Sequence, residues 1–335
     1  PSNITELAAS KLSKIMLMLF GWVRPSLKNS IMSLDLIHAH FGQDGAVALK
    51  LAQRFNKPLV VTFHGQDCTV HTWNKLRSFQ ISNYLYLYRR KKLFERASKI
   101  IAVSDFIKQT LIRQGCPDEK ICVHYIGVDI QKFQKNTKRS VSNSNGNLGP
   151  LKLLSVGRHE EKKGLDYLIK AIDKTNFDVT LDIIGDGSKF HSNSDLVLKL
   201  GLEKKVNLLG KRTSKEVSCA MGEADVFCLP SVTANNGDCE AFGIVFIEAA
   251  ARGLPVVSTM HGGIPEAVDN NITGILCQEK NSAQLASAFK LLREKPELAK
   301  SMGEAGRAMV EKHFDIKIQG KKLLKIYEEA VKHGS

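Results

Sequence analysis

The stretch LKLLSVGRHEEKKGLDYLIKAID, Leu151 to Asp173, has the pattern of one strand, one turn and one helix. Its first six residues are mostly apolar and the run stops at Gly157, which is typical of a buried strand. A polar, cationic turn follows up to Gly164, and from Leu165 the apolar residues recur every three or four positions, which indicates a helix. A strand followed directly by a helix is half of a βαβ unit, so this stretch predicts a parallel sheet covered by helices.

The same alternation recurs on both sides of this stretch, and its order predicts an α/β protein with two doubly wound units. Before it, we expect strands at 36–40, 59–64, 100–104 and 121–126, and helices near 7–23, 45–56, 79–97 and 105–114. After it, we expect strands at 179–184, 206–209, 226–229, 255–258 and 274–277, and helices near 214–222, 243–252, 282–293 and 296–312.

The composition of residues 134–150, rich in Asn, Ser, Lys and Gly, predicts a linker between the two units. We therefore expect an N-terminal Rossmann-like domain at 1–148 and a C-terminal Rossmann-like domain at 149–316. A last helix at 317–335 can cross back to the first domain. No strand followed by a Gly-rich turn precedes residue 36, so we expect the first domain to lack its opening strand and glycine loop.

The overall composition is that of an ordinary globular protein. The chain has 335 residues, of which 43% are hydrophobic and 24% charged. The apolar run Ile15–Val23 has only nine residues, far fewer than the ~20 that span a bilayer. Seven Cys, with no C-x-x-C pair, argue against a disulfide framework or a zinc site and for a reducing compartment. With no signal peptide pattern, we expect a cytoplasmic protein.

The positive charge is concentrated in the first half of the chain. Residues 1–150 have 22 Lys or Arg against 9 Asp or Glu, and the remaining residues have 26 against 25. Such a basic half can simply solvate the surface, or it can meet an anionic bilayer or a phosphorylated substrate. Nucleic acid is disfavoured, because neither an RNP aromatic pattern nor zinc-finger spacing is present. For a membrane surface the candidates are Arg89, Arg90, Lys91 and Lys92, and the run 15–23 beside Lys11 and Lys14.

Two cations follow the strand that ends at Val156. Arg158 and Lys163 occupy the turn at the carboxyl end of this strand, where ligands bind in parallel α/β sheets. A guanidinium fork and an ammonium both suit phosphate. Neither a G-x-G-x-x-G after an opening strand nor a P-loop sequence is present, so a nicotinamide, flavin or P-loop nucleotide site is not predicted.

A second strand-to-helix turn runs through LPSVTANNGDCEAFGIVFIE, Leu229 to Glu248. The free N–H groups of a helix that begins near Gly243 form an anion site, and a glycine there lets a phosphate approach the backbone closely. Glu248 can accept hydrogen bonds from a ribose diol, as acidic residues do in dinucleotide folds. Glu240, just ahead of the helix, can face a sugar ring.

Glu240 and Glu248 match the E-x7-E motif of retaining glycosyltransferases with the GT-B fold, and the sequence resembles glycosyltransferase family 4. The flanking matches in the second half are VGR at 156–158, KKG at 162–164, IIGDG at 183–187, FCLPS at 227–231, EAAARGLPVVS at 248–258 and GGIPE at 262–266. Those in the first half are HAHFG at 38–42, TFHGQD at 62–67, AVS at 102–104 and YIGVD at 125–129. The segment from Pro230 to Glu240 is similar to a bacterial subgroup that builds exopolysaccharide of the colanic acid type, except that Ala241 replaces its usual Gly.

This resemblance implies two Rossmann-like domains that face a central cleft. It also implies a retaining, metal-independent transfer of a hexose from a nucleotide-diphosphate sugar to a lipid-linked oligosaccharide or polysaccharide acceptor, in cell-surface polysaccharide biosynthesis. The protein would work in the cytoplasm or at the inner face of the plasma membrane, with no cofactor and no nucleic acid. A truncated, non-catalytic nucleotide-sugar-binding relative and a GT-B-fold nucleotide-sugar epimerase are the alternatives.

The resemblance also assigns roles to residues. Arg158 and Lys163 would bind the donor diphosphate and stabilise it as leaving group, Glu248 would hold the ribose, and Glu240 the donor sugar. His64 resembles the family's histidine beside the transferred sugar. The remaining donor-binding residues are Gly157, Gly185, Phe242, Gly243 and Ile244. Of the two histidines on the preceding strand, His38 and His40, we expect one in the core and one at the cleft, and neither as catalytic.

Overall fold

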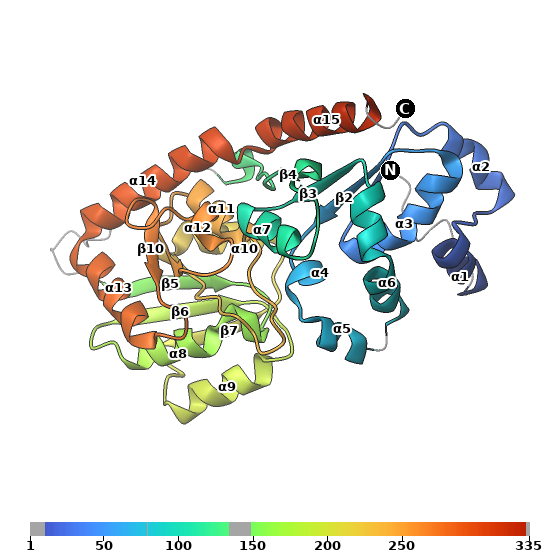
Figure 1. Ribbon diagram of the computed structural model, residues 1–335. Helices are drawn as coiled ribbons and strands as arrows, with labels where there is room; N and C mark the ends of the chain where they lie inside the picture. The colour runs from blue at the N-terminus through green and yellow to red at the C-terminus, as the bar shows by residue number, and fades with distance from the viewer. Residues whose placement is uncertain (1–10, 79, 134–148, 333–335) are drawn as a thin grey trace. The chain divides into compact units, whose positions relative to one another are not determined.

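The computed structural model describes residues 11–78, 80–133 and 149–332, and it contains two compact units (Figure 1). The first unit consists of the described chain up to Tyr125, the loop Asn236–Ala241 and the chain from Gly320 onward. The second consists of Ile126–Asn235 and Phe242–Gln319, less the residues that the structure does not describe. Each unit is built on one parallel sheet, so the predicted α/β class with two sheet-containing units is confirmed.

In the described residues of the first unit the sheet has four parallel strands in the order β1-β2-β3-β4. They are β1 (Ile37–His40), β2 (Leu59–Phe63), β3 (Lys99–Ala102) and β4 (Ile121–Val123). All five residues of β2 are buried, as expected for an inner strand covered on both faces. The helices of this unit are α1 (Lys11–Phe20), α2 (Pro25–Met32), α3 (Gly42–Phe55), α4 (Gln66–Thr69), α5 (Thr72–Arg77), α6 (Ile81–Arg96) and α7 (Asp105–Arg113), with a short 3-10 turn at Asp118–Lys120.

The sheet of the second unit has six parallel strands in its described residues, in the order β10-β9-β8-β5-β6-β7. They are β5 (Leu151–Val156), β6 (Val179–Ile184), β7 (Val206–Gly210), β8 (Val226–Cys228), β9 (Val256–Thr259) and β10 (Gly274–Cys277). The order reverses direction at β5 and β8, so the carboxyl ends of these two neighbours form the switch point where α/β sheets bind ligands. The helices are α8 (Leu165–Asp173), α9 (Phe190–Lys199), α10 (Ser214–Glu223), α11 (Ile244–Ala251), α12 (Ile264–Ala267), α13 (Ser282–Glu294) and α14 (Pro296–His313).

The last helix, α15 (Ile316–Lys332), supplies part of the core of the first unit from Gly320 onward. Ala330 is fully buried in a cluster with Val60 and Ile101 from the inner strands. Leu323, Ile326 and Tyr327 pack against the same cluster. These residues recur at helical spacing, so one apolar face of α15 covers the sheet.

The limits of the compact units differ from the predicted domain limits of 148/149 and 316/317. Val128 N donates a hydrogen bond to Phe314 O (2.8 Å), and Ile316 N donates to Val128 O (3.0 Å), which ties the chain after Tyr125 to the second unit. The predicted linker, residues 134–150, lies outside the described residues except for its last two positions. The start of the helix predicted at 7–23 also lies outside them.

Arg89 is not one of the surface charges that the sequence predicts. It is 7% exposed, and its guanidinium donates hydrogen bonds to Met18 O (2.7 Å), Leu19 O (3.1 Å) and Ala46 O (3.0 Å). Met18 and Leu19 belong to the last turn of α1, whose carbonyls have no partner within the helix. A guanidinium has five donors and can satisfy several such carbonyls at once, so Arg89 caps α1 and joins it to α6.

The apolar residues at the end of α1 divide between the core and the surface. Leu17 and Val23 are 4% and 3% exposed, which fits packing inside the unit. Leu19 and Phe20 are 44% and 60% exposed. Among the helices that the structure describes, none combines the length and the apolar composition that crossing a membrane requires.

Candidate active site

In the second unit, the turns that follow the neighbouring strands β5 and β8 are packed against each other. Gly164 ends the cationic turn with φ +60°, and a Cβ built on it would lie 2.1 Å from Pro230 O. Val232 N donates a hydrogen bond to Lys162 O (2.8 Å). Only glycine allows this contact, so Gly164 fixes the cationic turn against the first residues of the long loop after β8.

The two predicted phosphate ligands lie on this turn. Arg158 is exposed. Lys163 is half-buried and is the last residue of the short 3-10 helix Glu161–Lys163. A Cβ on Gly157 would be 3.7 Å from Lys163 Cε, so the lysine side chain passes close to the first residue after β5. The side chain of Lys163 therefore lies beside the main chain at the strand end, whereas the side chain of Arg158 is exposed to solvent.

Gly185, a predicted donor-binding residue, lies against Gly157. It follows β6 with φ +144°, and a Cβ on it would be 1.9 Å from Gly157 O. Gly157 N donates to Ile184 O (3.0 Å), which extends the pairing of β5 and β6 by one residue. The structure therefore brings Gly157 and Gly185 into main-chain contact at the carboxyl edge of the sheet.

His159 stabilises the cationic turn through buried contacts, a role that the sequence did not reveal. It is fully buried, and its Nδ1 is 3.1 Å from Asn193 Nδ2 in a hydrogen bond. Its main-chain N donates to Asp186 O (3.0 Å), and its carbonyl accepts from Lys189 N (2.7 Å). Burial lowers the pKa of the imidazole, so it is neutral at pH 7 and braces the loop after β6 against the turn that carries Arg158.

The helix α11 begins at the predicted position, with Gly243 as its N-terminal cap at φ +84°. Phe242 is buried and its ring lies 5.4 Å from that of Phe314, which anchors the chain just before the helix. Ile244 is 40% exposed, so the first turn of α11 is accessible. Glu248 is half-buried one turn further on, and burial raises the pKa of its carboxyl above the ordinary value.

The loop between β8 and α11 is braced at its first half by Glu279. The carboxylate of Glu279 accepts hydrogen bonds from Thr233 N (2.7 Å) and His261 Nδ1 (2.9 Å). Further along, Asn235 N donates to Glu161 Oε1 (3.1 Å), which is on the cationic turn. These contacts fix the loop before it leaves the second unit.

Residues 236–241 of this loop, including Glu240, are part of the first unit. Ser104, after β3, donates its hydroxyl to Ala241 O (2.5 Å), and a Cβ on Gly65 would lie 2.6 Å from Ala241 Cβ. Glu240 itself is 8% exposed. Gly65 has φ +118° and directly follows His64. The methyl group of Ala241 therefore packs against the turn that carries the predicted histidine.

His64 directly follows β2 and is half-buried, beside the rings of His40 and Phe41 at the end of β1. Its Nε2 is hydrogen-bonded to His40 Nδ1 at 2.9 Å, and its ring centroid is 4.7 Å from that of Phe41. Burial, together with the charge of His40, lowers the pKa of His64 to about 4. His64 is therefore a neutral imidazole at pH 7, able to donate or accept a hydrogen bond but carrying no charge.

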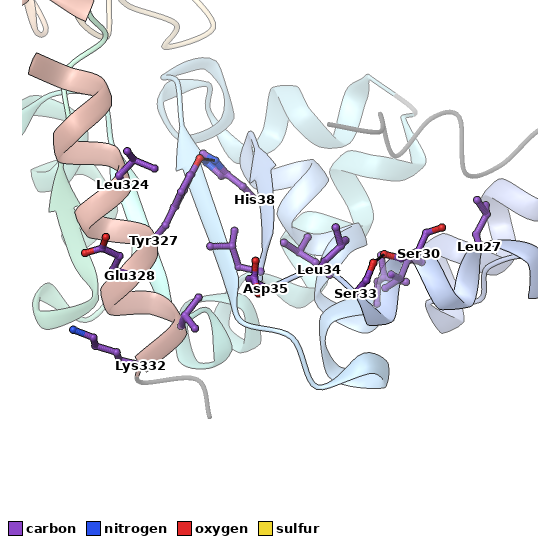
Figure 2. Close-up of a pocket in the computed structure, with 15 residues that line it drawn as sticks. Leu27, Ser30, Ser33, Leu34, Asp35, His38, Leu324, Tyr327, Glu328 and Lys332 are labelled. Carbon is purple, nitrogen blue, oxygen red and sulfur yellow. Dashed lines mark hydrogen bonds between the residues drawn. The ribbon is translucent and has the colours of Figure 1, made fainter. Parts of the chain in front are cut away.

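His38 and His40 differ in exposure, since His38 is half-buried and His40 is exposed, and the two rings lie side by side. Residues two apart on a strand share one face, and the two rings lie 4.4 Å apart. His38 is hydrogen-bonded through Nδ1 to Tyr327 Oη (2.7 Å) and through Nε2 to Thr62 Oγ1 (2.8 Å). Figure 2 shows His38 and Tyr327 directed toward each other.

Asp67 is a second residue whose role the sequence did not reveal, although it lies in the TFHGQD match. Its carboxylate is 1% exposed and accepts hydrogen bonds from Gly42 N and Gly65 N, both at 2.9 Å. Lys75 Nζ donates to the main-chain oxygen of Asp67 (2.6 Å). Burial raises the pKa of Asp67 to about 6 against the opposing effect of these N–H groups and of Lys75.

The predicted site residues therefore form two groups, one in each unit. His64 and Glu240 belong to the first unit, where Gly65 and Ala241, their sequence neighbours, are in contact. The others belong to the second unit, around the carboxyl ends of β5, β6 and β8; they are Gly157, Arg158, Lys163, Gly185, Phe242, Gly243, Ile244 and Glu248.

A cavity of about 870 Å³ lies in the first unit (Figure 2). It is formed by α2, the segment leading into β1 and the end of α15. Its lining is mainly apolar, with Leu34 and Leu324 among the residues, and the His38–Tyr327 pair lies at its wall.

Comparison with protein families and curated proteins gives consistent results. Residues 136–309 match the family described as Glycosyl transferases group 1, and residues 7–132 match Glycosyltransferase Family 4. The putative colanic acid biosynthesis glycosyltransferase WcaL of Escherichia coli is 33% identical over 302 residues, which cover 88% of this chain and 70% of that protein. The amylovoran biosynthesis glycosyltransferase AmsK of Erwinia amylovora is 33% identical over 299 residues, with the same coverage of 88% and 70%.

Among solved structures, the Anabaena protein Alr3699/HepE in complex with UDP and glucose superposes with a TM-score of 0.75. It is 25% identical to this chain, and the match covers 90% of this chain and 80% of that one. The sucrose-phosphate synthase of Thermosynechococcus elongatus, at 24% identity, gives a TM-score of 0.74 over 88% of this chain and 73% of that one. The second likeness concerns the fold alone.

We predict that acid weakens the fold through His38. Burial, followed by the charges of His40, His64 and His124, lowers its pKa to about 4 from the ordinary 6.5. The unfolded chain then binds the proton more tightly, so stability is fully present above about pH 6.5 and is lost as the pH falls toward 4. Between pH 7 and pH 5, the free energy of unfolding in urea should fall by about 1 kcal/mol more in wild type than in His38→Gln, because partial exposure of His38 reduces the effect of its pKa shift.

The control for this experiment is His191→Gln, which removes an exposed histidine of the second unit and should unfold with the pH dependence of wild type. The pKa of Asp67 is raised in the folded protein, so its effect on the free energy of unfolding has the opposite sign. Asp67 is present in all three proteins, so this contribution cancels in the comparison. Equal pH dependence in wild type and His38→Gln would contradict the prediction.

Proposed function

Since the chain belongs to the glycosyl transferases of group 1 and has the predicted GT-B fold of two parallel-sheet units, we propose that it is a retaining hexosyltransferase that uses a nucleotide-diphosphate sugar as donor. The observation that carries the proposal is the cationic turn of Arg158 and Lys163, fixed by Gly164 against the turn after β8. This places two positive side chains at the switch point of the sheet, where a diphosphate would bind.

The charge change of the reaction explains why these groups are useful. Breaking the bond between the sugar and the diphosphate leaves an oxocarbenium-like sugar and adds charge to the leaving diphosphate. The guanidinium of Arg158 and the ammonium of Lys163 would stabilise that charge, together with the N–H groups at the start of α11. Gly157, Gly185 and Gly243 would let the donor approach the main chain closely, and Phe242 and Ile244 would contact it through their backbone.

The remaining predicted residues would recognise the ribose and the sugar. Glu248 would accept hydrogen bonds from the ribose diol, which would replace the water that burial removes from its carboxylate. Glu240 and His64 would contact the transferred hexose, the first as a carboxylate and the second as a neutral imidazole. Retention of configuration is proposed from the match of Glu240 and Glu248 to the E-x7-E motif.

We propose that this transfer needs no metal ion, because the two positive side chains of Arg158 and Lys163 can neutralise the leaving diphosphate in its place. The acceptor would be a lipid-linked oligosaccharide or a polysaccharide of the cell surface. Support comes from WcaL and AmsK, which are named for colanic acid and amylovoran biosynthesis. UDP is a candidate nucleotide, since the Anabaena structure contains UDP and glucose.

We predict that Arg158→Ala and Lys163→Ala lower kcat about 10²-fold to 10³-fold, as the loss of a group that stabilises transition-state charge does. The KM for the donor should change much less, because the charge develops only as the bond breaks. The measurement is steady-state release of UDP from UDP-glucose with a cell-surface lipid extract as acceptor, with and without EDTA. Lys174→Ala, an exposed lysine at the far end of α8, is the control.

Activity should survive EDTA in wild type and in the Lys174→Ala control. Raised KM with unchanged kcat in both site variants would show that the cations only hold the donor. Loss of all activity in EDTA, restored by Mg²⁺, would contradict metal-independent transfer.

We also propose that the first unit meets the anionic inner face of the plasma membrane, where a lipid-linked acceptor would be found. Lys91 and Lys92 on α6 are exposed, and Tyr88, one turn earlier, is 87% exposed. The hydrogen bonds of Arg89 join this helix to the end of α1, where Leu19 and Phe20 are exposed. Lysines attract anionic lipid, and aromatic rings favour the bilayer interface.

We predict that the double variant Lys91→Glu/Lys92→Glu binds anionic vesicles at least tenfold more weakly than wild type, at about 1 kcal/mol per lysine near the surface. Co-sedimentation with phosphatidylglycerol-containing and pure phosphatidylcholine vesicles, at low and high salt, measures this. The matched control is Lys204→Glu/Lys205→Glu in the second unit, which makes the same charge change and should bind like wild type. Binding that responds to neither lipid charge nor salt would overturn the proposal.

A further inference from the structure

The turn after β1 and the turn after β2 are held together by one buried carboxylate. Oδ2 of Asp67 accepts the N–H of Gly42, the first residue of α3, and Oδ1 accepts the N–H of Gly65. Each turn carries one histidine, His40 at the end of β1 and His64 after β2. Because both oxygens of a 1%-exposed carboxylate are used, the separation of the two turns is fixed by a group that cannot easily exchange its partners for water.

Within this fixed frame the two imidazoles meet directly. His40 Nδ1 and His64 Nε2 are 2.9 Å apart, and the ring centroids are 5.2 Å apart with the planes inclined by 25°, a stacked arrangement. In a pair of neutral imidazoles one nitrogen must donate and the other accept, so the bond couples the tautomers of both rings. His64 Nδ1 is the ring nitrogen that His40 does not engage.

His40 is in turn held from its other side. The ring of His38 lies 4.4 Å from it, and His38 is fixed at both nitrogens, by Tyr327 Oη (2.7 Å) and Thr62 Oγ1 (2.8 Å). Figure 2 shows how Tyr327 reaches His38 from α15. The imidazole of His40 is thus packed between a ring that cannot turn and the ring of His64, although His40 itself is exposed to solvent.

We propose that His40 is a positioning residue that holds His64 in one tautomer and one orientation, so that Nδ1 of His64 faces the hexose that the enzyme transfers. This inference rests on the proposed function of His64, and it adds a residue for which no role was predicted. His40 acts through His64 and makes no contact with the sugar. The exposed position of His40 means that its replacement should leave the core of the unit intact.

The charged and titratable groups around the pair come from several elements. His38 and His40 come from β1, His124 from the end of β4, Asp44 from the first turn of α3 and Asp67 from the start of α4. Burial and His40 lower the pKa of His64 to about 4, so both roles of a neutral imidazole are available at pH 7. Replacing His40 by an uncharged ring should therefore raise the pKa of His64 toward its ordinary value.

The direct experiment is ¹⁵N NMR of the histidine rings in the full-length chain without substrate. Wild type should show His64 as a single tautomer, with widely separated Nδ1 and Nε2 shifts. His40→Phe keeps a ring that can stack on His38 but has no N–H, and it should give averaged His64 shifts. His40→Asn should restore the single tautomer, because an Asn amide lies near the place of Nδ1. Gln66→Ala, an exposed neighbour on the same turn, is the control and should leave the His64 signals unchanged.

The kinetic experiment uses UDP-glucose as the probe. His40→Phe should lower kcat about tenfold with donor KM within about twofold of wild type, a smaller loss than the ~10²-fold that a 1 Å misplacement can cause. His40→Asn should recover most of the activity. Thermal unfolding of each variant checks that the fold is retained.

Identical His64 shifts in wild type and His40→Phe would overturn the proposal, as would equal losses of kcat in the Phe and Asn variants. The proposal for His40 and the proposed function can be contradicted independently of each other. A wild-type protein that transfers no sugar from any nucleotide donor would contradict the proposed function, whereas the NMR comparison still decides whether His40 sets the tautomer of His64.

Discussion

The second unit of this protein depends on main-chain contacts between turns that only glycine permits. Gly164 touches Pro230 O and Gly185 touches Gly157 O, so three loops at the carboxyl edge of one sheet are packed backbone to backbone. Any Cβ at Gly164 or Gly185 would push the turn that carries Arg158 and Lys163 away from its neighbours. The main chain of the turn that carries the two cations is therefore fixed by the absence of side chains at these glycines, and the buried His159 packs against the loop after β6.

The turns of the first unit are held together by a side chain in place of glycine contacts. The turns after β1 and β2 are held by a buried carboxylate, Asp67, and the ring of His64 belongs to a series of ring contacts that runs through His40 and His38 to Tyr327. The second unit thus presents two positive side chains, and the first presents the neutral imidazole of His64. That division suits a reaction in which a diphosphate gains charge while a hexose is held by its hydroxyls.

The sequence predicted the fold well because its decisive signals are local. Apolar runs and helical periodicity located β5, α8 and α11, whereas α9 has few buried apolar residues and gives no such pattern. Contacts between distant residues were not predictable. Ser104 and Ala241 are 137 positions apart, so nothing local shows that Glu240 belongs to the first unit. Arg89 was taken as a surface charge because the sequence does not show the end of α1 against it, and Asp67 lay in a recognised match without an evident role.

We propose that the turn after β5 holds the donor diphosphate through Arg158 and Lys163. A crystal structure of the full chain with bound UDP tests this proposal most directly. We expect diphosphate oxygens within hydrogen-bond distance of the guanidinium of Arg158 and the ammonium of Lys163, and the ribose diol on the carboxylate of Glu248. A diphosphate bound elsewhere, with neither cation in contact, would contradict it.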